Sequence, residues 1–244
     1  MMFSESELAE LKNDRIPHHI AIIPDGNRRW AKSESLKPGK GHEKGVDLIM
    51  NTVLAAKAIG IKAITFYGFS TENWKRSQDE VDLLLWLAEC FLVQETPKMM
   101  QENIRFRSLG DLDRLSPHLR QVFLNTAETT KNNDGIDFVI AMNYGSRDEI
   151  VRATKKIADK VRGGILSLDE INEELFAAHL DSYPLPDPDL LIRTSGENRI
   201  SNFLLWQLSY AELYTIPLKW PEFTPKDLFE AVKTFQERER RQGL

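Results

Sequence analysis

The alternation of short, apolar, β-rich runs with helical patterns is the feature that most constrains the fold of this chain. Six of these runs predict strands, at His19–Ile23, Ala63–Phe69, Ile104–Leu109, Ile136–Met142, Leu190–Arg193 and Leu213–Ile216. Alternating β and α elements favour a parallel sheet with helices on both faces. We therefore predict one α/β domain over residues 1–244, with a central, six-stranded, mostly parallel sheet flanked by helices and a loosely ordered N-terminal segment at 1–17.

The ends of the expected helices carry recognisable capping residues. Capping boxes are indicated by spacing at Ser77–Glu80, Ser146–Glu149 and Ser167–Glu170. Ser116 and Thr224 each precede a proline at the first helical position. Gly60 and Gly135 stand where helices should stop.

Composition narrows the partners and the location. The net charge is -5, whereas a protein that binds duplex nucleic acid usually has a basic excess, so we expect no nucleic-acid partner. The single cysteine, Cys90, cannot form an internal disulfide, and the N-terminus lacks the basic and apolar regions of a signal peptide. No run approaches the roughly 18 apolar residues of a membrane span. These features predict a cytoplasmic protein.

Polar side chains gather directly after three of the expected strands. The three clusters are residues 25–30, 70–76 and 193–201. Ligands of parallel sheets bind at the carboxyl ends of the strands, so we expect the clusters to form one site. Glu212 fits this rule less well, because it precedes the expected sixth strand.

The first cluster reads Asp25-Gly26-Asn27-Arg28-Arg29-Trp30. A carboxylate suits Mg²⁺ and arginine forks suit phosphate oxygens, so these residue types favour a diphosphate with its metal. The same residues are strong turn formers, and the two interpretations are compatible.

The third cluster places Arg193 and Arg199 around a glycine turn, with Ser201 beyond. Two arginines in this arrangement can hold one diphosphate from two sides, and a surface loop of salt bridges is the alternative. The second cluster, Ser70–Arg76, has more polar and aromatic groups than a helix cap needs, which favours a functional role.

Residues 37–45 combine lysines and glycines in front of an expected helix, which is typical of an anion site. The segment is not a P-loop, because no Gly-Lys-Ser/Thr closes it, and it is not a dinucleotide fingerprint, because Lys44 stands where the third glycine would be needed. We expect Lys40 and Lys44 to be solvated. His42 is interpreted as a phosphate contact, with a capping or core histidine as the alternative.

The expected helix over Val81–Val93 is apolar nearly all round, since only Asp82 and Glu89 are polar within it. Such a helix is buried on most sides, yet it is too short to span a membrane. Two interpretations stay open: a core or dimer-interface helix, or the wall of an apolar tunnel that holds a hydrocarbon chain.

Taken together, these motifs closely resemble those of the cis-prenyltransferases, and among them the bacterial undecaprenyl diphosphate synthases. The resemblance runs from about His18 to Gly243. It rests on Asp25–Ala31, Gly41-His42 with Gly45, Phe69–Trp74 with Arg76 and Glu80, Asn143-Tyr144-Gly145 with Arg147, and Asp189–Trp206 running on to Glu212. The tail Arg241-Gln242-Gly243 is similar to the family's C-terminal Arg-x-Gly, which reaches into the partner's active site in dimers.

The resemblance implies a Mg²⁺-dependent enzyme that condenses isopentenyl diphosphate onto an allylic diphosphate, typically farnesyl diphosphate. The product would be a long-chain polyprenyl diphosphate such as undecaprenyl diphosphate, a lipid carrier for cell-wall synthesis. It also implies a homodimer, and we expect transient contact with the inner face of the membrane for product release.

The resemblance also implies roles for particular residues. Asp25 would hold Mg²⁺, with Glu212 contributing, either directly or across the dimer, and Asp25 and Asn73 are the expected catalytic residues. A carboxamide is a very weak base, so Asn73 is expected to position a group or water rather than take the proton. The starter diphosphate would lie near Gly26, Asn27, Arg29 and His42, and isopentenyl diphosphate on Arg193, Arg199 and Ser201. The full expected substrate-binding set is Gly26, Asn27, Arg28, Arg29, Trp30, His42, Ser70, Thr71, Glu72, Trp74, Arg76, Arg193, Arg199, Ile200 and Ser201.

The chain departs from the family pattern at several positions. Pro38 stands where the family usually has an arginine, with Lys37 beside it, and a lysine lacks the arginine fork. The other departures are Pro24 for a common methionine, Arg28 for a common glycine, Ser146 for a second glycine and Asn198 for a histidine. None removes the metal carboxylate or the paired arginines.

Other functions are weighed against the same residues. A head-to-tail trans-prenyltransferase would need aspartate-rich motifs on an all-helical fold, and a nucleotide-binding protein would need a glycine loop of known type; neither pattern is present. A non-catalytic accessory subunit should have lost Asp25 or the paired arginines, which are retained. A medium-chain synthase stays open, because bulky Leu85, Trp86 and Phe91 would either shorten a tunnel or line it.

Overall fold

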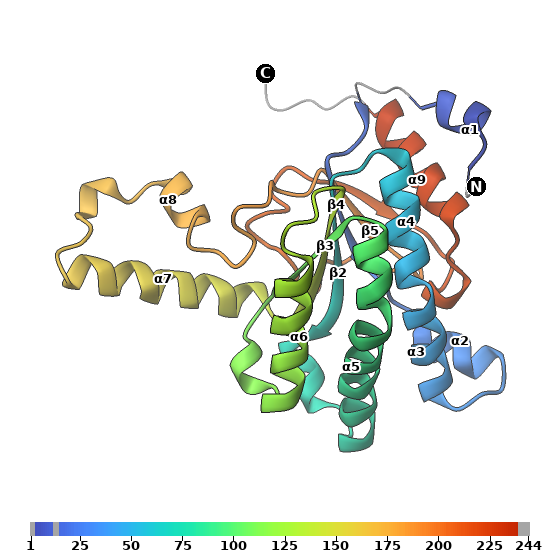
Figure 1. The fold of residues 1–244 in the computed structure, drawn as a ribbon, viewed down its shortest axis with the longest axis horizontal. Helices are drawn as coiled ribbons and strands as arrows, with labels where there is room; N and C mark the ends of the chain where they lie inside the picture. The colour runs from blue at the N-terminus through green and yellow to red at the C-terminus, as the bar shows by residue number, and fades with distance from the viewer. Residues whose placement is uncertain (1–2, 12–14, 239–244) are drawn as a thin grey trace.

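The computed structural model describes residues 3–11 and 15–238, and a six-stranded sheet lies at its centre (Figure 1). The strands are β1 (His19–Ile23), β2 (Ala63–Ser70), β3 (Ile104–Leu109), β4 (Ile136–Tyr144), β5 (Leu190–Arg193) and β6 (Glu212–Thr215). Their order is β3-β4-β2-β1-β5-β6, and every neighbouring pair is parallel. The predicted sheet is confirmed, and it is parallel throughout.

The strand limits follow the apolar runs because the sheet is covered on both faces. Every residue of β1, β4 and β5 is buried, which is why these strands are mainly apolar in sequence. Two ends differ from the prediction: β4 runs on to Tyr144, and β6 begins at Glu212.

One face of the sheet carries the main helical layer and the larger core (Figure 1). This layer contains α4 (Ile49–Ile59), α5 (Gln78–Gln101), α6 (Pro117–Thr130) and α9 (Pro225–Glu237). The core on this side includes an aromatic group in which Phe138 of β4 contacts the rings of Phe66, Phe91 and Phe106 edge-on.

The other face is covered differently from the expectation of helices on both sides. Phe203, Leu204 and Leu208, which lie in a turn-rich segment, pack there against β1, β4 and β5. Positive φ angles at Ser201, Asn202 and Leu204 interrupt regular helix in this segment. Irregular backbone therefore lies directly beside the carboxyl end of β5.

A long helix and a short one build an arm that extends away from the sheet (Figure 1). They are α7 (Ser146–Arg162) and α8 (Glu173–Ala177), joined through the 3₁₀ turn η4 (Leu168–Glu170). The arm is tied to the domain at the base of α7, where Glu149 is buried and accepts hydrogen bonds from the Tyr144 hydroxyl and the Asp181 N–H.

Several predicted helix ends are confirmed, and others are wrong. Ser116, Ser167 and Thr224 cap their helices, and Gly60 ends α4 with a positive φ of 100°. Ser77 precedes α5 without a side-chain capping bond. The predicted boundaries at Ser146 and Gly135 were wrong, because Ser146 is the first residue of α7 and α6 ends at Thr130, before Gly135.

Part of the N-terminal segment packs on the domain, although the sequence predicts loose order for 1–17. α1 (Glu5–Ala9) is flanked by buried Phe3 and Leu11, and the Phe3 ring lies 5.6 Å from that of Phe229 in α9. The tail motif Arg241-Gln242-Gly243 lies outside the described residues. Within those residues, no helix has the length and apolarity to cross a membrane.

Candidate active site

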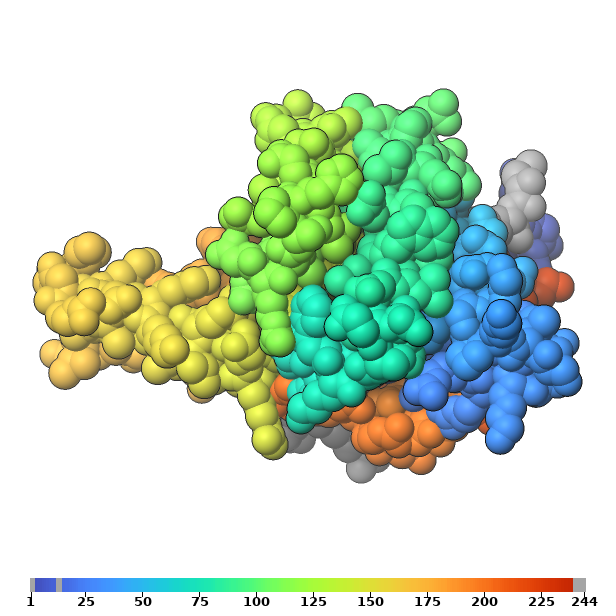
Figure 2. Space-filling model, turned by 90° about the horizontal axis from the view of Figure 1, so that it is seen from below, coloured from blue at the N-terminus to red at the C-terminus, as the bar shows by residue number. Residues whose placement is uncertain are grey.

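The three polar clusters meet at the carboxyl ends of three adjacent strands. Asp25 follows β1, Ser70 ends β2 and Arg193 ends β5. Figure 2 shows this end of the molecule, where the blue 25–45, teal 70–77 and orange 195–202 segments lie side by side. The strand order places β2, β1 and β5 next to one another, so residues far apart in sequence converge.

Asp25 is held from two sides by arginines. Its Oδ2 accepts a hydrogen bond from Arg193 Nη2 at 2.9 Å, and its Oδ1 accepts from Arg29 Nη2 at 3.2 Å and from the Gly26 N–H at 2.7 Å. Burial raises the pKa of the Asp25 carboxyl, but the hydrogen bond and charge of Arg193 outweigh burial, so the pKa lies below its ordinary value. The carboxylate is therefore ionised at neutral pH.

Arg193 lies at the centre of the site, and only 4% of the residue is exposed. One of its terminal nitrogens, Nη1, donates to Ser201 Oγ at 2.9 Å and to the Arg199 carbonyl, while Nη2 reaches Asp25. Its Nε is buried and has no hydrogen-bond partner among the residues that the structure describes. A buried donor without a partner costs stability, so this N–H is available for a ligand atom.

Arg199 and Arg29 lie near the same carboxylate and are more exposed than Arg193. Both make ion pairs with Glu197, and Arg199 Nη2 lies 4.0 Å from Asp25 Oδ2. Their side chains are 57% and 47% exposed, so they can leave these partners for a ligand at little cost.

Close packing of two short helices positions Asn27 and His42. α2 (Asn27–Ser33) follows Gly26, and α3 (Pro38–Asp47) crosses it at Gly41 and Gly45. A Cβ at Gly41 would lie 2.0 Å from the Asn27 carbonyl oxygen, and one at Gly45 would lie 2.3 Å from Asn27 Oδ1. The glycines of the Gly41-His42 motif therefore let α3 approach α2 closely. Asn27 Oδ1 is buried there without a hydrogen-bond partner among the described residues, and the buried His42 Nε2 has a long contact, at 3.5 Å, with Glu80 Oε1.

The segment after β2 is a 3₁₀ turn, η2 (Thr71–Lys75), that turns some side chains inward and others away. Asn73 Oδ1 accepts the Ser70 N–H at 3.0 Å, so its carbonyl oxygen is occupied and its amide nitrogen is the group left for a ligand. Trp74 points elsewhere: its Nε1 donates to Asn143 Oδ1 at 2.7 Å, and the Arg114 guanidinium lies over its ring at 4.7 Å. Trp74 is thus a packing residue in this structure.

Glu72 links the second cluster to the third. Its Oε1 accepts a hydrogen bond from Asn202 Nδ2 at 2.9 Å, and the Asn202 backbone carbonyl and side chain accept the N–H groups of Ser146 and Arg147. Tyr67 supports the same segment, because its ring stacks on Phe203 at 4.4 Å. These contacts fix the backbone that carries Ser201.

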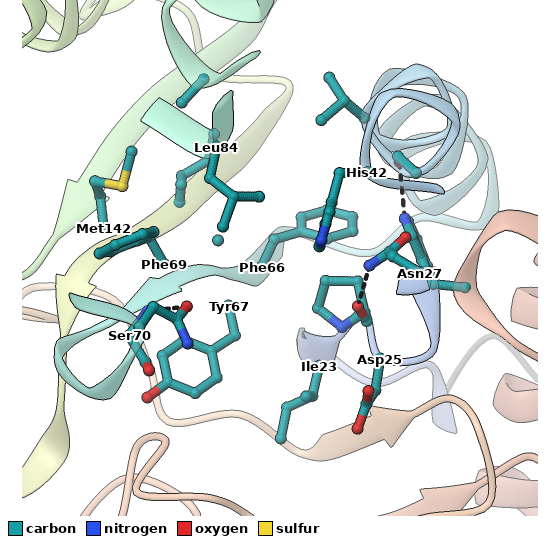
Figure 3. Close-up of a pocket in the computed structure, with 18 of the residues that line it drawn as sticks. Ile23, Asp25, Asn27, His42, Phe66, Tyr67, Phe69, Ser70, Leu84 and Met142 are labelled. Atoms are coloured by element: carbon teal, nitrogen blue, oxygen red, sulfur yellow. Dashed lines mark hydrogen bonds between the residues drawn. The ribbon is translucent and has the colours of Figure 1, made fainter. Parts of the chain in front are cut away.

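Two adjoining cavities open at this end of the sheet. The first, of about 690 Å³, has polar residues at one end and apolar residues at the other, and we call it the amphipathic cavity (Figure 3). The second, of about 700 Å³, lies over α2 and α3 and is lined by Arg28, Arg29, Lys32, His42 and Arg76 among others. Asp25, Asn27, His42 and Arg76 line both cavities. We call the second cavity the basic hollow.

The apolar end of the amphipathic cavity is built by α5 and the sheet. Leu84, Leu87, Ala88 and Phe91 line it from α5, facing Phe66, Phe69 and Met142 (Figure 3 labels four of these residues). The wall interpretation of the apolar helix therefore holds for its inner face. Trp86 lies on the outer side and is 55% exposed. A tunnel that continues beyond this cavity stays a prediction.

Most of the predicted site residues line one cavity or both. They are Asp25, Gly26, Asn27, Arg28, Arg29, His42, Ser70, Glu72, Asn73, Arg76, Arg193, Arg199 and Ser201. Trp30, Thr71, Trp74 and Ile200 line neither cavity. Their roles as substrate contacts stay predictions that this geometry does not support.

Sequence reasoning missed Tyr67 and Trp220, which both line the amphipathic cavity. Tyr67 sits next to Phe66 on β2, where alternation sends the two rings to opposite faces, and no motif marks it. Trp220 begins the 3₁₀ turn η5 (Trp220–Glu222) and donates its Nε1–H to the Gly45 carbonyl at 2.8 Å. In the sequence, the Trp220-Pro221 pair is the only feature that marks this residue.

Asp25 is suited to be the one carboxylate ligand that this chain supplies to Mg²⁺. Asp25 lines both cavities, and Mg²⁺ commonly takes one or two carboxylates with substrate phosphates and water. Glu212 does not lie beside Asp25 within the same chain, so the expected direct contribution of Glu212 to the same metal is wrong. Its contribution across a dimer stays a prediction. Glu212 pairs with Leu190 at the amino end of β6, opposite the site, and accepts from Arg238 Nη1 at 2.8 Å. Among the described residues, no three acidic, His or Cys side chains form a metal cluster.

This geometry defines a class of protein: a parallel α/β domain whose site joins a cationic mouth with one carboxylate to an apolar cavity. A family model described as undecaprenyl diphosphate synthase matches residues 23–243. The chain therefore belongs to the undecaprenyl diphosphate synthase family of prenyltransferase enzymes.

Individual relatives agree with this assignment. The chain is 44% identical to an isoprenyl transferase of Clostridium perfringens over 98% of this chain and 94% of that protein. It is 47% identical to a farnesyl-diphosphate-specific ditrans,polycis-undecaprenyl-diphosphate synthase of Vibrio parahaemolyticus, over 95% and 92% of the two chains.

Solved structures show the same fold. Lavandulyl diphosphate synthase from Lavandula x intermedia, in complex with dimethylallyl diphosphate, matches with a TM-score of 0.93 and 39% identity over 95% of this chain and all of that chain. A protein of Campylobacter jejuni described as a probable undecaprenyl diphosphate synthase matches with a TM-score of 0.78 and 36% identity, over 93% and 99% of the two chains.

Proposed function

We propose that this protein joins isopentenyl diphosphate to an allylic diphosphate and builds a long-chain cis-polyprenyl diphosphate. The observation that carries the proposal is the pairing of a cationic mouth with an apolar cavity in one site. A substrate with a diphosphate head and a hydrocarbon tail fits such a site, because arginines neutralise the head while apolar side chains bury the tail.

Two anion subsites support a two-substrate reaction. The basic hollow offers Arg28, Arg29 and Arg76 to the diphosphate of the allylic starter, whose tail enters the amphipathic cavity. Arg193, Arg199 and Ser201 form the second subsite, for isopentenyl diphosphate. The buried Arg193 Nε–H is available there to donate a hydrogen bond to that diphosphate. Asp25 lies between the two subsites and is held by arginines of both.

The proposed step breaks the bond between the allylic carbon and its diphosphate oxygen. The isopentenyl double bond attacks that carbon, a proton is lost from the isopentenyl unit, and a new cis double bond forms. Arginines placed at the starter diphosphate stabilise the negative charge that develops on it, which lowers the barrier most where the donors are already oriented. The Asn27 and His42 side chains line the same subsite.

Asp25 is the residue of this chain that would hold Mg²⁺. When bound, the ion would neutralise charge on the diphosphates. We propose that Glu212 contributes from the partner chain of a homodimer, since it lies at the opposite end of its own sheet.

Asn73 is proposed as a positioning residue rather than the base. Its Oδ1 is engaged by the Ser70 N–H, so Nδ2 is the free end and can only donate. A diphosphate oxygen or a water is the better proton acceptor.

The finer assignments of starter, product and location are proposals as well. Farnesyl diphosphate is proposed as the starter, because a close relative is named as specific for it. We further propose a cytoplasmic homodimer that contacts the membrane surface transiently, because a long polyprenyl chain is insoluble in water. An accessory-subunit role is disfavoured by the assembled Asp25–Arg193 pair.

Label incorporation tests the proposed function. Purified protein is mixed with labelled isopentenyl diphosphate and farnesyl diphosphate, in Mg²⁺ or in EDTA. We expect incorporation in Mg²⁺, none in EDTA, and a loss of at least about 100-fold in D25A. Equal incorporation in EDTA would refute the metal role, and no incorporation by the unaltered protein would favour the accessory-subunit alternative.

A further inference from the structure

Glu80 gathers three basic side chains from three separate parts of the chain. Its Oε1 lies 2.8 Å from Arg76 Nη1 and 3.5 Å from His42 Nε2, and its Oε2 lies 3.6 Å from Arg28 Nη1. Arg28 belongs to α2, His42 to α3, and Arg76 precedes α5. One carboxylate therefore joins the elements that enclose the basic hollow.

The three partners line the basic hollow, whereas Glu80 lies behind them and lines neither cavity. The Glu80 side chain is 16% exposed, and that of His42 is 10% exposed. A carboxylate so far removed from water needs charged partners, and its partners are held in turn.

The orientation of Glu80 is not explained by helix capping. The Ser77–Glu80 spacing predicts a capping box, yet Ser77 makes no side-chain cap bond at the start of α5. The Glu80 carboxylate is turned toward the basic groups instead. A structural role limited to the helix end would have left it on the backbone of Ser77.

Three basic groups facing one hollow repel each other when the hollow holds no anion. Burial and the charge of Arg76 lower the pKa of His42, and Glu80 acts in the opposite direction. Arg28 is 61% exposed and Arg76 32%, so without a partner both would sample many rotamers in water. A tether that keeps them oriented reduces the entropy lost when an anion binds.

We propose that Glu80 is a positioning residue, which holds Arg28, His42 and Arg76 ready for the diphosphate of the allylic starter. The inference rests on the proposed function of the basic hollow and deepens it. Glu80 does not touch the substrate: it acts through its three partners, and it contributes nothing to the Arg193 subsite for isopentenyl diphosphate.

The test compares E80Q with E43Q, a matched control. Glu43 lies beside His42 on α3, but its carboxylate pairs with Lys40 and lines neither cavity, so both variants lose one negative charge. Steady-state kinetics give KM for farnesyl diphosphate and for isopentenyl diphosphate separately. We expect E80Q to raise the farnesyl diphosphate KM about tenfold or more and to leave the isopentenyl diphosphate KM within about twofold. E43Q should change neither.

Calorimetric binding of farnesyl thiolodiphosphate, an unreactive analogue, provides a readout independent of turnover. Weaker binding to E80Q, by a similar factor, at an unchanged melting temperature supports positioning. Unchanged or tighter binding would overturn the proposal, because Glu80 would then be only a competing anion. Equal loss in both KM values would also overturn it. Unaltered protein that binds the analogue but incorporates no isopentenyl diphosphate would refute the proposed reaction while the Glu80 comparison stands.

Discussion

At the scale of single residues, Arg193 shows how one side chain can join parts of a site. Its guanidinium contacts Asp25 after β1, Ser201 and the Arg199 backbone at the same time. A lysine ammonium could not reach these partners together, because it lacks the planar fork. The two diphosphate subsites are therefore connected through one buried cation.

Replacing Arg193 by lysine should expose this dependence. Hydrogen bonds to charged groups are worth about 1.5–3 kcal/mol, so R193K should raise the KM for isopentenyl diphosphate about 10- to 100-fold. The control is R105K, which breaks another two-bonded pair, with Asp137 at the far edge of the sheet. Steady-state kinetics on both variants decide the matter, and equal effects would contradict the role given to Arg193.

Glu149 makes a prediction about pH. Burial, with the charge of Asp181, raises the pKa of Glu149 above its ordinary 4.5, although the Tyr144 and Gln207 hydrogen bonds oppose the shift. The folded protein thus binds this proton more tightly than the unfolded chain. The stabilisation is complete below pH 4.5 and is lost as the pH rises through the raised pKa.

E149Q cannot ionise and should lose that part of the pH dependence. The free energy of unfolding of the unaltered protein, relative to E149Q, should fall as the pH rises across this window. Denaturant titrations at several pH values measure the difference. A constant offset reflects the loss of one of the two carboxylate oxygens, which accept from the Tyr144 hydroxyl and the Asp181 N–H. Parallel curves at all pH values would show that Glu149 keeps its ordinary pKa.

Residue types and order predict most of the site, but not which way each side chain turns. Asp25, Arg193 and Ser201 follow strand ends, so topology alone brings them together. Trp74 looks equally functional in sequence, yet it packs on Asn143 because a 3₁₀ turn directs it there. Glu80 has capping-box spacing, but two arginines and His42 compete with the backbone for it. Such competitions are decided by tertiary contacts.

At the scale of elements, α5 separates two environments. Leu84, Ala88 and Phe91 face the cavity, whereas Trp86 and Val93 are exposed. The sequence pattern alone could not separate these faces, because apolar residues occupy both. Only packing against β2 and β4 distinguishes the cavity wall from the outer stripe.

Phe91 is expected to limit product length. Its ring lines the cavity and meets Phe138 edge-on at 5.9 Å, so it stands between the cavity and the aromatic core. F91A should shift products toward longer chains in sized chromatography, at a stability cost of about 3–5 kcal/mol, and F91L should shift them less. W86A is the control on the outer face. An unchanged product distribution in F91A would contradict this assignment.

At the scale of the whole molecule, alternating patterns predict the parallel sheet, because buried parallel strands are apolar on both faces. They do not predict the cover of the second face, where Phe203, Leu204 and Leu208 pack from irregular backbone. Nor could strand order alone have excluded Glu212 from the site, since this required the position of β6. In the structure Glu212 begins β6 at the amino end of the sheet.

A mixed dimer tests the proposal that Glu212 serves the partner's site. D25A and E212A chains, each inactive alone, are unfolded and refolded together. If the site is shared, one site of each mixed dimer carries both substitutions and the other carries neither. Roughly a quarter of the unaltered activity should then return, because half of the dimers are mixed. No recovery, with mixed dimers shown by mass spectrometry, would place Glu212 outside the partner's site.

The central claim is that this one site adds isoprene units with cis geometry, and analysis of the product tests it most directly. Labelled isopentenyl diphosphate and farnesyl diphosphate are incubated with the protein and Mg²⁺, and the products are sized by chromatography and examined by NMR. The account predicts a ladder of polyprenyl diphosphates in which every added double bond is cis. Added trans double bonds, or products lacking any unit from isopentenyl diphosphate, would contradict it.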